Sequence, residues 1–215
     1  MIRKTAIVIG ATGLVGKALV NELANSDHFS QVITLTRKKY NHNSDKVINH
    51  VIQFDDLALY ANLFKADCFF SCLGTTKKQA GSINNQRKVD FTYQLKAAQL
   101  AIANDVSHYL LVSSSGANEN STSQYLKMKG ELELKIKQLP FNTISIFQPS
   151  LLIGSRDEFR FAEKIASWFL GLLCKLPFLN RYRPISGKQV AIKMIQTCLT
   201  QTEALTIYNL DEIFI

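Results

Sequence analysis

Short apolar runs rich in β-branched residues alternate with longer stretches of helical period along most of the chain. This alternation is typical of a parallel sheet covered by helices on both faces, because every parallel connection needs a crossover segment. Right-handed crossovers then predict one doubly wound α/β sheet of about seven strands. The expected strands are Thr5–Ile9, Gln31–Thr36, Asn49–Gln53, Asp67–Cys72, His108–Val112, Thr143–Phe147 and Leu205–Leu210.

Helices are expected between these strands at Leu14–Asn25, Arg87–Asn104 and Ser123–Leu139, with a short helical turn near Asp56–Phe64. The alternation lapses after the sixth strand, where two helices are expected at about 160–174 and 187–200. We interpret 155–200 as a small helical region that covers the sheet, and a lid over a substrate pocket is the alternative. No linker interrupts the chain, so residues 1–215 are expected to form a single domain.

The composition is that of an ordinary globular protein, with 215 residues of which 47% are hydrophobic and 20% charged. It excludes a disordered chain, a collagen-like repeat and a disulfide scaffold. The four cysteines and four histidines lack metal-ligand spacing, so no metal site is expected. The most apolar stretch, 168–179, is shorter than a bilayer span and contains Lys175 and Pro177, so no transmembrane helix is expected.

A formal net charge of +8 raises the question of a nucleic-acid partner. The excess lies in two separate segments, 1–46 and 155–193, and the sequence contains no nucleic-acid motif. We therefore expect no nucleic-acid binding. The chain enters its first strand at Thr5, which leaves no room for a signal peptide, and a cytoplasmic location is predicted.

The first expected strand runs directly into a glycine-rich loop and then into a helix. Gly10 allows the tight turn, Gly13 lets a pyrophosphate approach the backbone, and Gly16 lets the helix pack closely on the sheet. Amide groups at the start of the helix then face the phosphates with a favourable dipole. A purely structural glycine turn is the alternative. The loop predicts nucleotide binding by Gly10, Ala11, Thr12, Gly13, Leu14, Val15 and Gly16.

The end of the second strand distinguishes NAD from NADP. An NAD site usually has an Asp or Glu there to accept from the ribose 2′-hydroxyl, whereas a 2′-phosphate needs cations. This chain has Arg37 and Lys38, and no acidic residue occurs between Gln31 and Ser44. We expect Arg37 to pair with the phosphate and Lys38 to support it, which favours NADP(H) over NAD(H). A solvated basic loop is the alternative.

Two later strand ends are expected to complete the cofactor site, because ligands of such sheets lie across the carboxyl ends of the strands. Asp55 follows the third strand and is a candidate acceptor for the adenine amino group. Gly74 follows the fourth strand, where it lets the backbone approach a ribose. Ordinary turns are the alternative at both places. The candidate segment after the fourth strand is Cys72, Leu73, Gly74 and Thr75.

Three serines, Ser113, Ser114 and Ser115, follow the fifth strand, and Tyr125 and Lys129 lie one helical turn apart in the next helix. A phenol is a weak acid at neutral pH, but a nearby ammonium group favours its phenolate and makes it a usable acid–base catalyst. A serine hydroxyl at the strand end can hold a substrate carbonyl or alcohol beside that phenol. The order of glycine loop, serines, tyrosine and lysine predicts a catalytic or formerly catalytic site.

These motifs resemble the short-chain dehydrogenase/reductase superfamily, and within it the small atypical branch of Tat-interacting oxidoreductase-like proteins. The resemblance spans nearly the whole chain and implies a Rossmann fold. By the same resemblance Tyr125 is the proton donor or acceptor, and Lys129 binds the nicotinamide ribose and stabilises the tyrosinate. Ser115 is the better candidate for orienting the substrate, with Ser114 as the alternate. The segments that carry the resemblance are Gly10–Gly16, Ser71–Thr76, Val89–Asp90 with Tyr93, His108–Ala117, Tyr125–Glu131 and Phe147–Ser150.

Three further expectations concern the surroundings of this site. Pro149 and Ser150 are implied by the resemblance to lie near the nicotinamide. Asp90 stands where many members of the superfamily have an Asn that supports a water relay, so the chain departs from the pattern there. Glu131 and Glu133 are expected to be solvated or to pair with nearby lysines. Thr75–Asn85 is expected to be a polar connection, either a mobile loop over the substrate or a plain solvated loop.

We therefore predict an NADP(H)-dependent oxidoreductase that transfers hydride to or from a small carbonyl or alcohol, as a monomer or homodimer. The region after Ser155 is too short for a large substrate domain, so a modest apolar or mixed substrate is expected. The alternative is a non-enzymatic protein of the same fold that senses NADP(H) and binds a partner protein.

Overall fold

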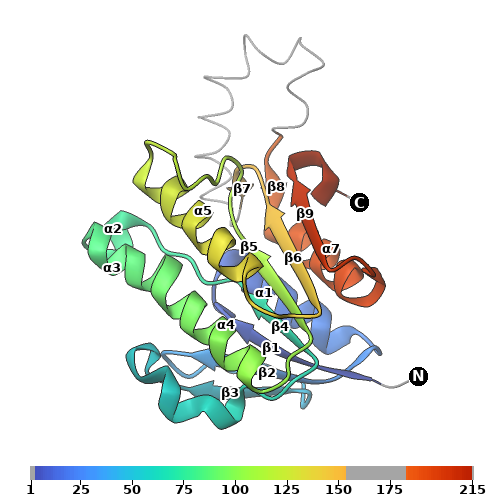
Figure 1. The fold of residues 1–215 in the computed structure, drawn as a ribbon. Coiled ribbons are helices and arrows are strands. Elements are labelled where there is room, and N and C mark those ends of the chain that lie inside the picture. The colour runs from blue at the N-terminus through green and yellow to red at the C-terminus, as the bar shows by residue number, and fades with distance from the viewer. Residues whose placement is uncertain (1–2, 154–182, 215) are drawn as a thin grey trace.

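Seven parallel strands form the centre of the protein in the order β3-β2-β1-β4-β5-β6-β9 (Figure 1). The computed structural model describes residues 3–153 and 183–214. This order is that of a Rossmann fold, and it confirms the doubly wound sheet expected from the sequence. The strands are β1 (Lys4–Ile9), β2 (Phe29–Thr36), β3 (Val47–Val51), β4 (Cys68–Ser71), β5 (His108–Val112), β6 (Thr143–Gln148) and β9 (Leu205–Asn209).

Helices cover both faces of the sheet (Figure 1). On one face, α1 (Leu14–Asn25) and α7 (Gly187–Thr200) pack along each other. On the other face lie α4 (Tyr93–Ala103) and α5 (Gln124–Lys137). The central strands β4 and β5 are buried along their whole length, which is why they are nearly continuous apolar runs without alternation.

The apolar side chains divide into two clusters, one on each face of the sheet. In the first, α1 contributes Leu19 and Leu23, and α7 contributes Met194. In the second, Ala97 of α4 and Leu132 of α5 pack against the opposite face. Successive residues of a strand point to opposite faces, so Ile7 and Val8 of β1 belong to different clusters.

The segment between β4 and α4 differs most from the expectation. It forms α2 (Lys77–Ala80), α3 (Ile83–Arg87) and a π-helical turn, η2 (Lys88–Thr92), which continues into α4. The single helix expected at Arg87–Asn104 is thus a π turn followed by an α-helix. Thr76 and Ser82 cap the two short helices through their side chains, and Gly81 ends α2 with φ +79°.

The remaining elements are short. η1 (Phe54–Leu63) is the helical turn expected near Asp56–Phe64. A two-stranded parallel pair, β7 (Leu152–Ile153) and β8 (Ile185–Ser186), lies outside the main sheet, and η4 (Leu210–Ile213) follows β9.

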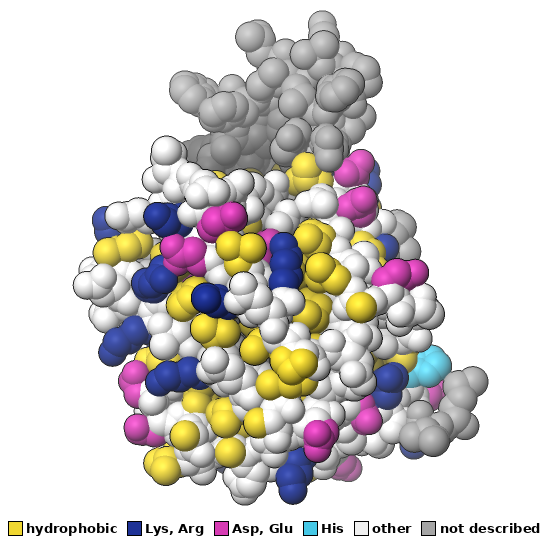
Figure 2. Space-filling model, viewed as in Figure 1, with side chains coloured by type: hydrophobic (Ala, Val, Ile, Leu, Met, Phe, Trp, Pro, Cys, Tyr) yellow, Lys and Arg dark blue, Asp and Glu magenta, His cyan; other side chains and the backbone are white. Residues whose placement is uncertain are grey.

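The helix expected at 187–200 is α7, which packs on α1 and the sheet. The helix expected at about 160–174 lies outside the described residues, so the lid interpretation of that range stays a prediction. No helix among the described residues is both long and apolar enough to cross a bilayer. On the face drawn in Figure 2, basic side chains are interspersed with acidic ones, and they form no single basic field there.

Candidate functional site

The loops that follow β1, β4, β5 and β6 meet at one edge of the sheet, and backbone hydrogen bonds tie them together beyond the strand ends. The Cys72 amide donates to the Ile9 carbonyl at 3.0 Å, and the Ser113 amide donates to the Phe147 carbonyl at 2.7 Å. The Ser115 amide donates to the Pro149 carbonyl at 3.0 Å. Because ligands of open parallel sheets bind at the carboxyl ends of the strands, this edge is the candidate site.

The glycine loop after β1 is shaped by two close backbone approaches. Gly10 has φ +78°, and a Cβ there would overlap the carbonyl of Cys72 at the end of β4. A Cβ at Gly16 would overlap the backbone of Gly10, so α1 can approach the loop this closely only with glycine there. A Cβ on Gly13 would meet only the Gly10 carbonyl, at 3.3 Å, and Gly13 is exposed.

The first turn of α1 fits an anionic group. Gly13 is the N-cap, no side chain caps the helix, and its first turn contains no acidic residue. The amides at the start of a helix have no intrahelical acceptor and carry partial positive charge. The side chains of Ala11 and Val15 are buried in the core, so these two residues present only their backbone. The exposed residues of the loop are Thr12, Gly13 and Leu14.

A charged corner lies beyond the ends of β2 and β3. Arg37 and Lys38 are exposed, and the Lys38 carbonyl accepts from the Thr36 hydroxyl at 2.7 Å. The Asp55 carboxylate is already engaged, because the Tyr93 hydroxyl donates to it at 2.8 Å and the Lys88 ammonium lies 3.8 Å away. Burial and the Asp55 carboxylate raise the pKa of Tyr93 to about 12, with the neighbouring Arg37 acting in the opposite direction.

Lys129 and Asp90 form a buried ion pair at the centre of the site. Their exposed fractions are 3% and 0%, and Lys129 Nζ lies 3.3 Å from Asp90 Oδ1. The other carboxylate oxygen accepts from the Thr75 amide at 3.1 Å. Desolvation raises the pKa of Asp90, whereas Lys129 and the Thr75 amide lower it, and desolvation is the larger effect.

A second pair of polar side chains, Gln94 and Ser71, is connected to the Asp90 backbone by hydrogen bonds. Gln94 donates through Nε2 to the Asp90 carbonyl at 2.9 Å and accepts through Oε1 from the Ser71 hydroxyl at 2.7 Å. From the sequence, Asp90 was notable only because many members of the superfamily have an Asn at this position. Its ion pair with Lys129 was not expected, because 39 positions separate the two residues.

Ser113 does not face the site with its neighbours. Its hydroxyl donates to the buried carboxylate of Glu133, which also accepts from Gln148 Nε2 at 2.9 and 3.0 Å. Ser114 and Ser115 are half-buried, and they remain the two serines whose hydroxyls could face a ligand. Glu133 is not solvated, since only 4% of this residue is exposed, but the expected pairing with a lysine is present, because Lys137 lies 3.8 Å away. Glu131 pairs instead with Arg87.

The predicted residues after β4 and β6 also reach this edge. Leu73 and Thr75 are half-buried and Gly74 is exposed. Burial raises the pKa of the Cys72 thiol to about 12 despite the nearby Lys129, so the thiol stays neutral at physiological pH. Pro149 is tied to Ser115 through its carbonyl, and the Ser150 hydroxyl donates to the Arg183 carbonyl at 2.6 Å.

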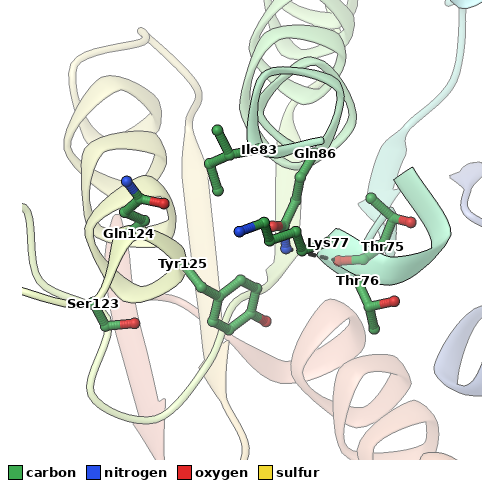
Figure 3. A pocket seen from close by; sticks show the side chains of 8 residues that line it. All are labelled: Thr75, Thr76, Lys77, Ile83, Gln86, Ser123, Gln124 and Tyr125. Atoms are coloured by element: carbon green, nitrogen blue, oxygen red, sulfur yellow. Dashed lines mark hydrogen bonds between the residues drawn. The ribbon is translucent and has the colours of Figure 1, made fainter. Parts of the chain in front are cut away.

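A cavity of about 450 Å³ opens beside Tyr125. In Figure 3 the Tyr125 ring projects from the start of α5 toward the segment that carries Thr75 and Thr76. Gln86 fixes one wall by donating to the Thr75 carbonyl at 3.0 Å. Sequence reasoning missed most of this pocket, because its walls belong to the short helices α2 and α3. The lining residues are Thr75, Thr76, Lys77, Ile83, Gln86, Ser123, Gln124 and Tyr125.

The loop after β5 packs closely against α5 at Asn118. A Cβ on Gly130 would overlap the backbone of Asn118, and the Asn118 amide donates to the Leu126 carbonyl at 3.1 Å. Glycine at this point of α5 therefore allows the close contact. Among the described residues, no cluster of His, Cys, Asp and Glu could hold a metal ion.

Comparison with known proteins is consistent with this geometry. Residues 6–164 match the model of the NAD dependent epimerase/dehydratase family. The chain is 38% identical over 177 residues to "Protein HTATIP2" of Rattus norvegicus, covering 80% of this chain and 73% of that protein. It is 33% identical over 215 residues to "Protein FMP52, mitochondrial" of Candida glabrata, covering 96% and 90%. The expected resemblance to Tat-interacting oxidoreductase-like proteins is thereby confirmed.

The relatives also correct one expectation. FMP52 proteins of Candida glabrata and Debaryomyces hansenii are named as mitochondrial. This finding contradicts the predicted cytoplasmic location, which rested only on how early the first strand begins.

Solved structures share the fold at low identity. WbmH of Bordetella bronchiseptica, in complex with NAD+, superposes with a TM-score of 0.74 at 11% identity over 97% of this chain and 76% of that chain. MoeE5, in complex with UDP-glucose and NAD, gives 0.70 at 14% identity over 97% and 79%.

Proposed function

The chain belongs to the NAD dependent epimerase/dehydratase family, and we propose that it is an NADP(H)-dependent oxidoreductase of the atypical short-chain dehydrogenase type. Its substrate is a small carbonyl compound or alcohol. The observation that carries the proposal is the position of Tyr125, which lines a cavity one helical turn before the buried Lys129–Asp90 pair.

The cofactor would be held along the edge of the sheet by the groups described above. The uncapped start of α1 and the exposed backbone of Gly13 fit the pyrophosphate. Gly74 and Lys129 would face the nicotinamide half, with Pro149 and Ser150 on the neighbouring loop. The nicotinamide supplies or accepts hydride when it is bound.

Tyr125 carries out the proton transfer that accompanies hydride transfer. In reduction its hydroxyl donates a proton to the substrate oxygen, and in oxidation it accepts one. Lys129 lies one turn along the same helix, where it would bind the nicotinamide ribose. Asp90 orients the Lys129 side chain and, through the Thr75 amide, fixes the loop after β4. Ser115, or Ser114, holds the substrate oxygen in place.

The preference for NADP(H) rests on Arg37 and Lys38. Both are exposed immediately after β2, where an NAD site would have an acidic residue. Asp55 is less available than the sequence suggested, because its carboxylate is bound by Tyr93 and lies near Lys88. We expect Arg37→Ala to weaken NADPH binding about tenfold, as the loss of one charge-assisted contact, and to leave NADH binding nearly unchanged.

A deuterium-transfer assay tests the proposal. The wild type is incubated with NADPH deuterated at the nicotinamide C4 and a panel of small aldehydes and ketones, and the products are analysed by mass spectrometry. Incorporation of deuterium into an alcohol product is the expected result. Tight binding of NADPH without transfer to any carbonyl would refute the oxidoreductase and favour a cofactor-sensing protein.

A further inference from the structure

We propose that the cavity beside Tyr125 recognises a substrate with an anionic group, a carboxylate or a phosphate, through Lys77. The inference rests on the proposed function, since it names the substrate class for the same site. Three features of the cavity support it: its charge, the helix end that faces it, and the arrangement of its walls.

The cavity is positively charged. Lys77 is the one charged side chain among its eight lining residues, and none of the eight is acidic. Within the described part of the chain, no ion pair includes Lys77. The buried Lys129 is bound to Asp90 and does not line the cavity. An anionic ligand would therefore find its partner in Lys77.

The start of α5 adds to this positive potential. Ser123 is the N-cap of α5, and Gln124 and Tyr125 are its first two residues, so three lining residues belong to the helix N-terminus. No side chain caps this end, and the first turn contains no acidic residue. The amides there have no acceptor within the helix, and the helix dipole favours a negative charge beside them.

The walls suit a small molecule with an apolar body and one charged end. Figure 3 shows Lys77 extending into the space between α3 and the start of α5, opposite Gln124 and Tyr125. Ile83 and the Tyr125 ring supply apolar surface. A volume of about 450 Å³ lies at the lower end of the range for small-molecule pockets. A compound whose carbonyl meets Tyr125 can thus place its anionic end at Lys77.

A pair of aldehydes of similar size tests this recognition. 4-Carboxybenzaldehyde and 4-methylbenzaldehyde differ in charge at one end, and both are offered with saturating NADPH to the wild type, Lys77→Met and Lys78→Met. Lys78 is exposed and does not line the cavity, so its variant loses the same charge without touching the site. We expect the wild type to have a KM at least tenfold lower for the carboxylate, Lys77→Met to lose this preference, and Lys78→Met to keep it. Equal KM values for the two aldehydes in the wild type would overturn the inference.

Binding measurements separate this inference from the proposed function. Benzoate and inorganic phosphate are titrated calorimetrically into the NADPH-loaded proteins, which requires no turnover. Binding of either anion that is lost in Lys77→Met supports the anion site even if neither aldehyde is reduced, and the tighter of the two identifies the preferred group. Reduction of 4-methylbenzaldehyde without Lys77-dependent anion binding would leave the oxidoreductase in place and refute the inference.

Discussion

Two buried carboxylates, Glu133 of α5 and Asp90 of η2, have different hydrogen-bond and ion-pair partners. Glu133 accepts hydrogen bonds from Ser113 and Gln148, which follow or end neighbouring strands, and Lys137 lies nearby. Asp90 has the Lys129 ammonium and one backbone amide, and its Oδ1 atom is buried without a hydrogen bond of good geometry among the described residues.

In the proposed function, the difference separates a structural acid, Glu133, from an acid that serves the active site, Asp90. Glu133 joins the ends of β5 and β6 to α5, so its hydrogen bonds are a reason for the strand ends to keep their positions. Asp90 instead holds a lysine that the proposed chemistry requires. A buried charge that is incompletely satisfied costs stability, and such groups concentrate at functional sites.

The largest expected effect follows from breaking the Asp90 pair. Lys129→Met leaves the Asp90 carboxylate buried without its cation, which should lower the free energy of unfolding by about 3–5 kcal/mol. The double variant Lys129→Met with Asp90→Asn removes the unpaired charge and should recover part of this loss. Urea denaturation of the three proteins at pH 7 provides the values. A single-variant loss below about 1 kcal/mol would mean that the pair is not buried in solution.

A smaller loss of stability is expected when Glu133 is replaced. Glu133→Ala leaves the Ser113 hydroxyl and the Gln148 amide without their acceptor, which should cost about 1–3 kcal/mol. Glu131→Ala is the matched control on the same helix, because Glu131 pairs with the exposed Arg87, and it should cost at most about 1 kcal/mol. Thermal unfolding monitored by circular dichroism checks both. Equal losses of stability in Glu133→Ala and Glu131→Ala would show that Glu133 does not hold the ends of β5 and β6 to α5.

Ser113 and Ser115 provide the same comparison of a structural with a functional group, measured by turnover. Ser113→Ala removes a donor to Glu133 and should affect mainly stability, with a change in kcat/KM of about twofold or less. Ser115→Ala should instead lower kcat/KM about 10- to 100-fold while leaving stability nearly unchanged. Steady-state kinetics on an accepted aldehyde distinguish them. If Ser114→Ala shows the larger loss, the alternate serine holds the substrate.

The smallest expected effect is the change in stability with pH that the raised pKa of Asp90 causes. Its pKa in the folded protein is raised above the ordinary value of about 3.9, so the folded state holds this proton more tightly than the unfolded state. The stability that protonated Asp90 contributes is therefore fully present at pH values below the ordinary pKa. It is lost as the pH rises through the raised pKa of the folded protein. Relative to the wild type, Asp90→Asn should become more stable between pH 4 and pH 7. A relative stability that falls over this range would mean that Lys129 lowers the Asp90 pKa below its ordinary value.

Most of the sheet could be predicted from the sequence. All seven strands and the helices α1 and α7 fall within a few residues of their expected bounds, because apolar periodicity reflects burial directly. The short helices α2 and α3 were missed, since they are polar and depend on the caps at Thr76 and Ser82 and on the positive φ of Gly81. The π turn at η2 gives no periodic signal of its own.

The site was predictable as a set of residue types but not as a set of contacts. The glycine loop and the spacing of Tyr125 and Lys129 follow from local geometry, and the structure brings them to one edge of the sheet. The partners of Lys129 and Ser113 come from distant segments, and nothing in the local sequence identifies Asp90 or Glu133 as those partners. Glu133 was expected to be solvated or to pair with lysines of its own helix, whereas its hydrogen bonds with Ser113 and Gln148 were not expected.

In the proposed reaction, Tyr125 performs proton transfer beside a bound cofactor. The most direct test measures kcat/KM for a reduced aldehyde and the Kd of NADPH in the wild type and Tyr125→Phe. We expect a loss of about 10²- to 10⁴-fold in kcat/KM, because the phenol hydroxyl is the acid. We also expect a Kd within about twofold of the wild type, since the ring is retained. Turnover of Tyr125→Phe at the wild-type rate would show that Tyr125 is not the proton donor.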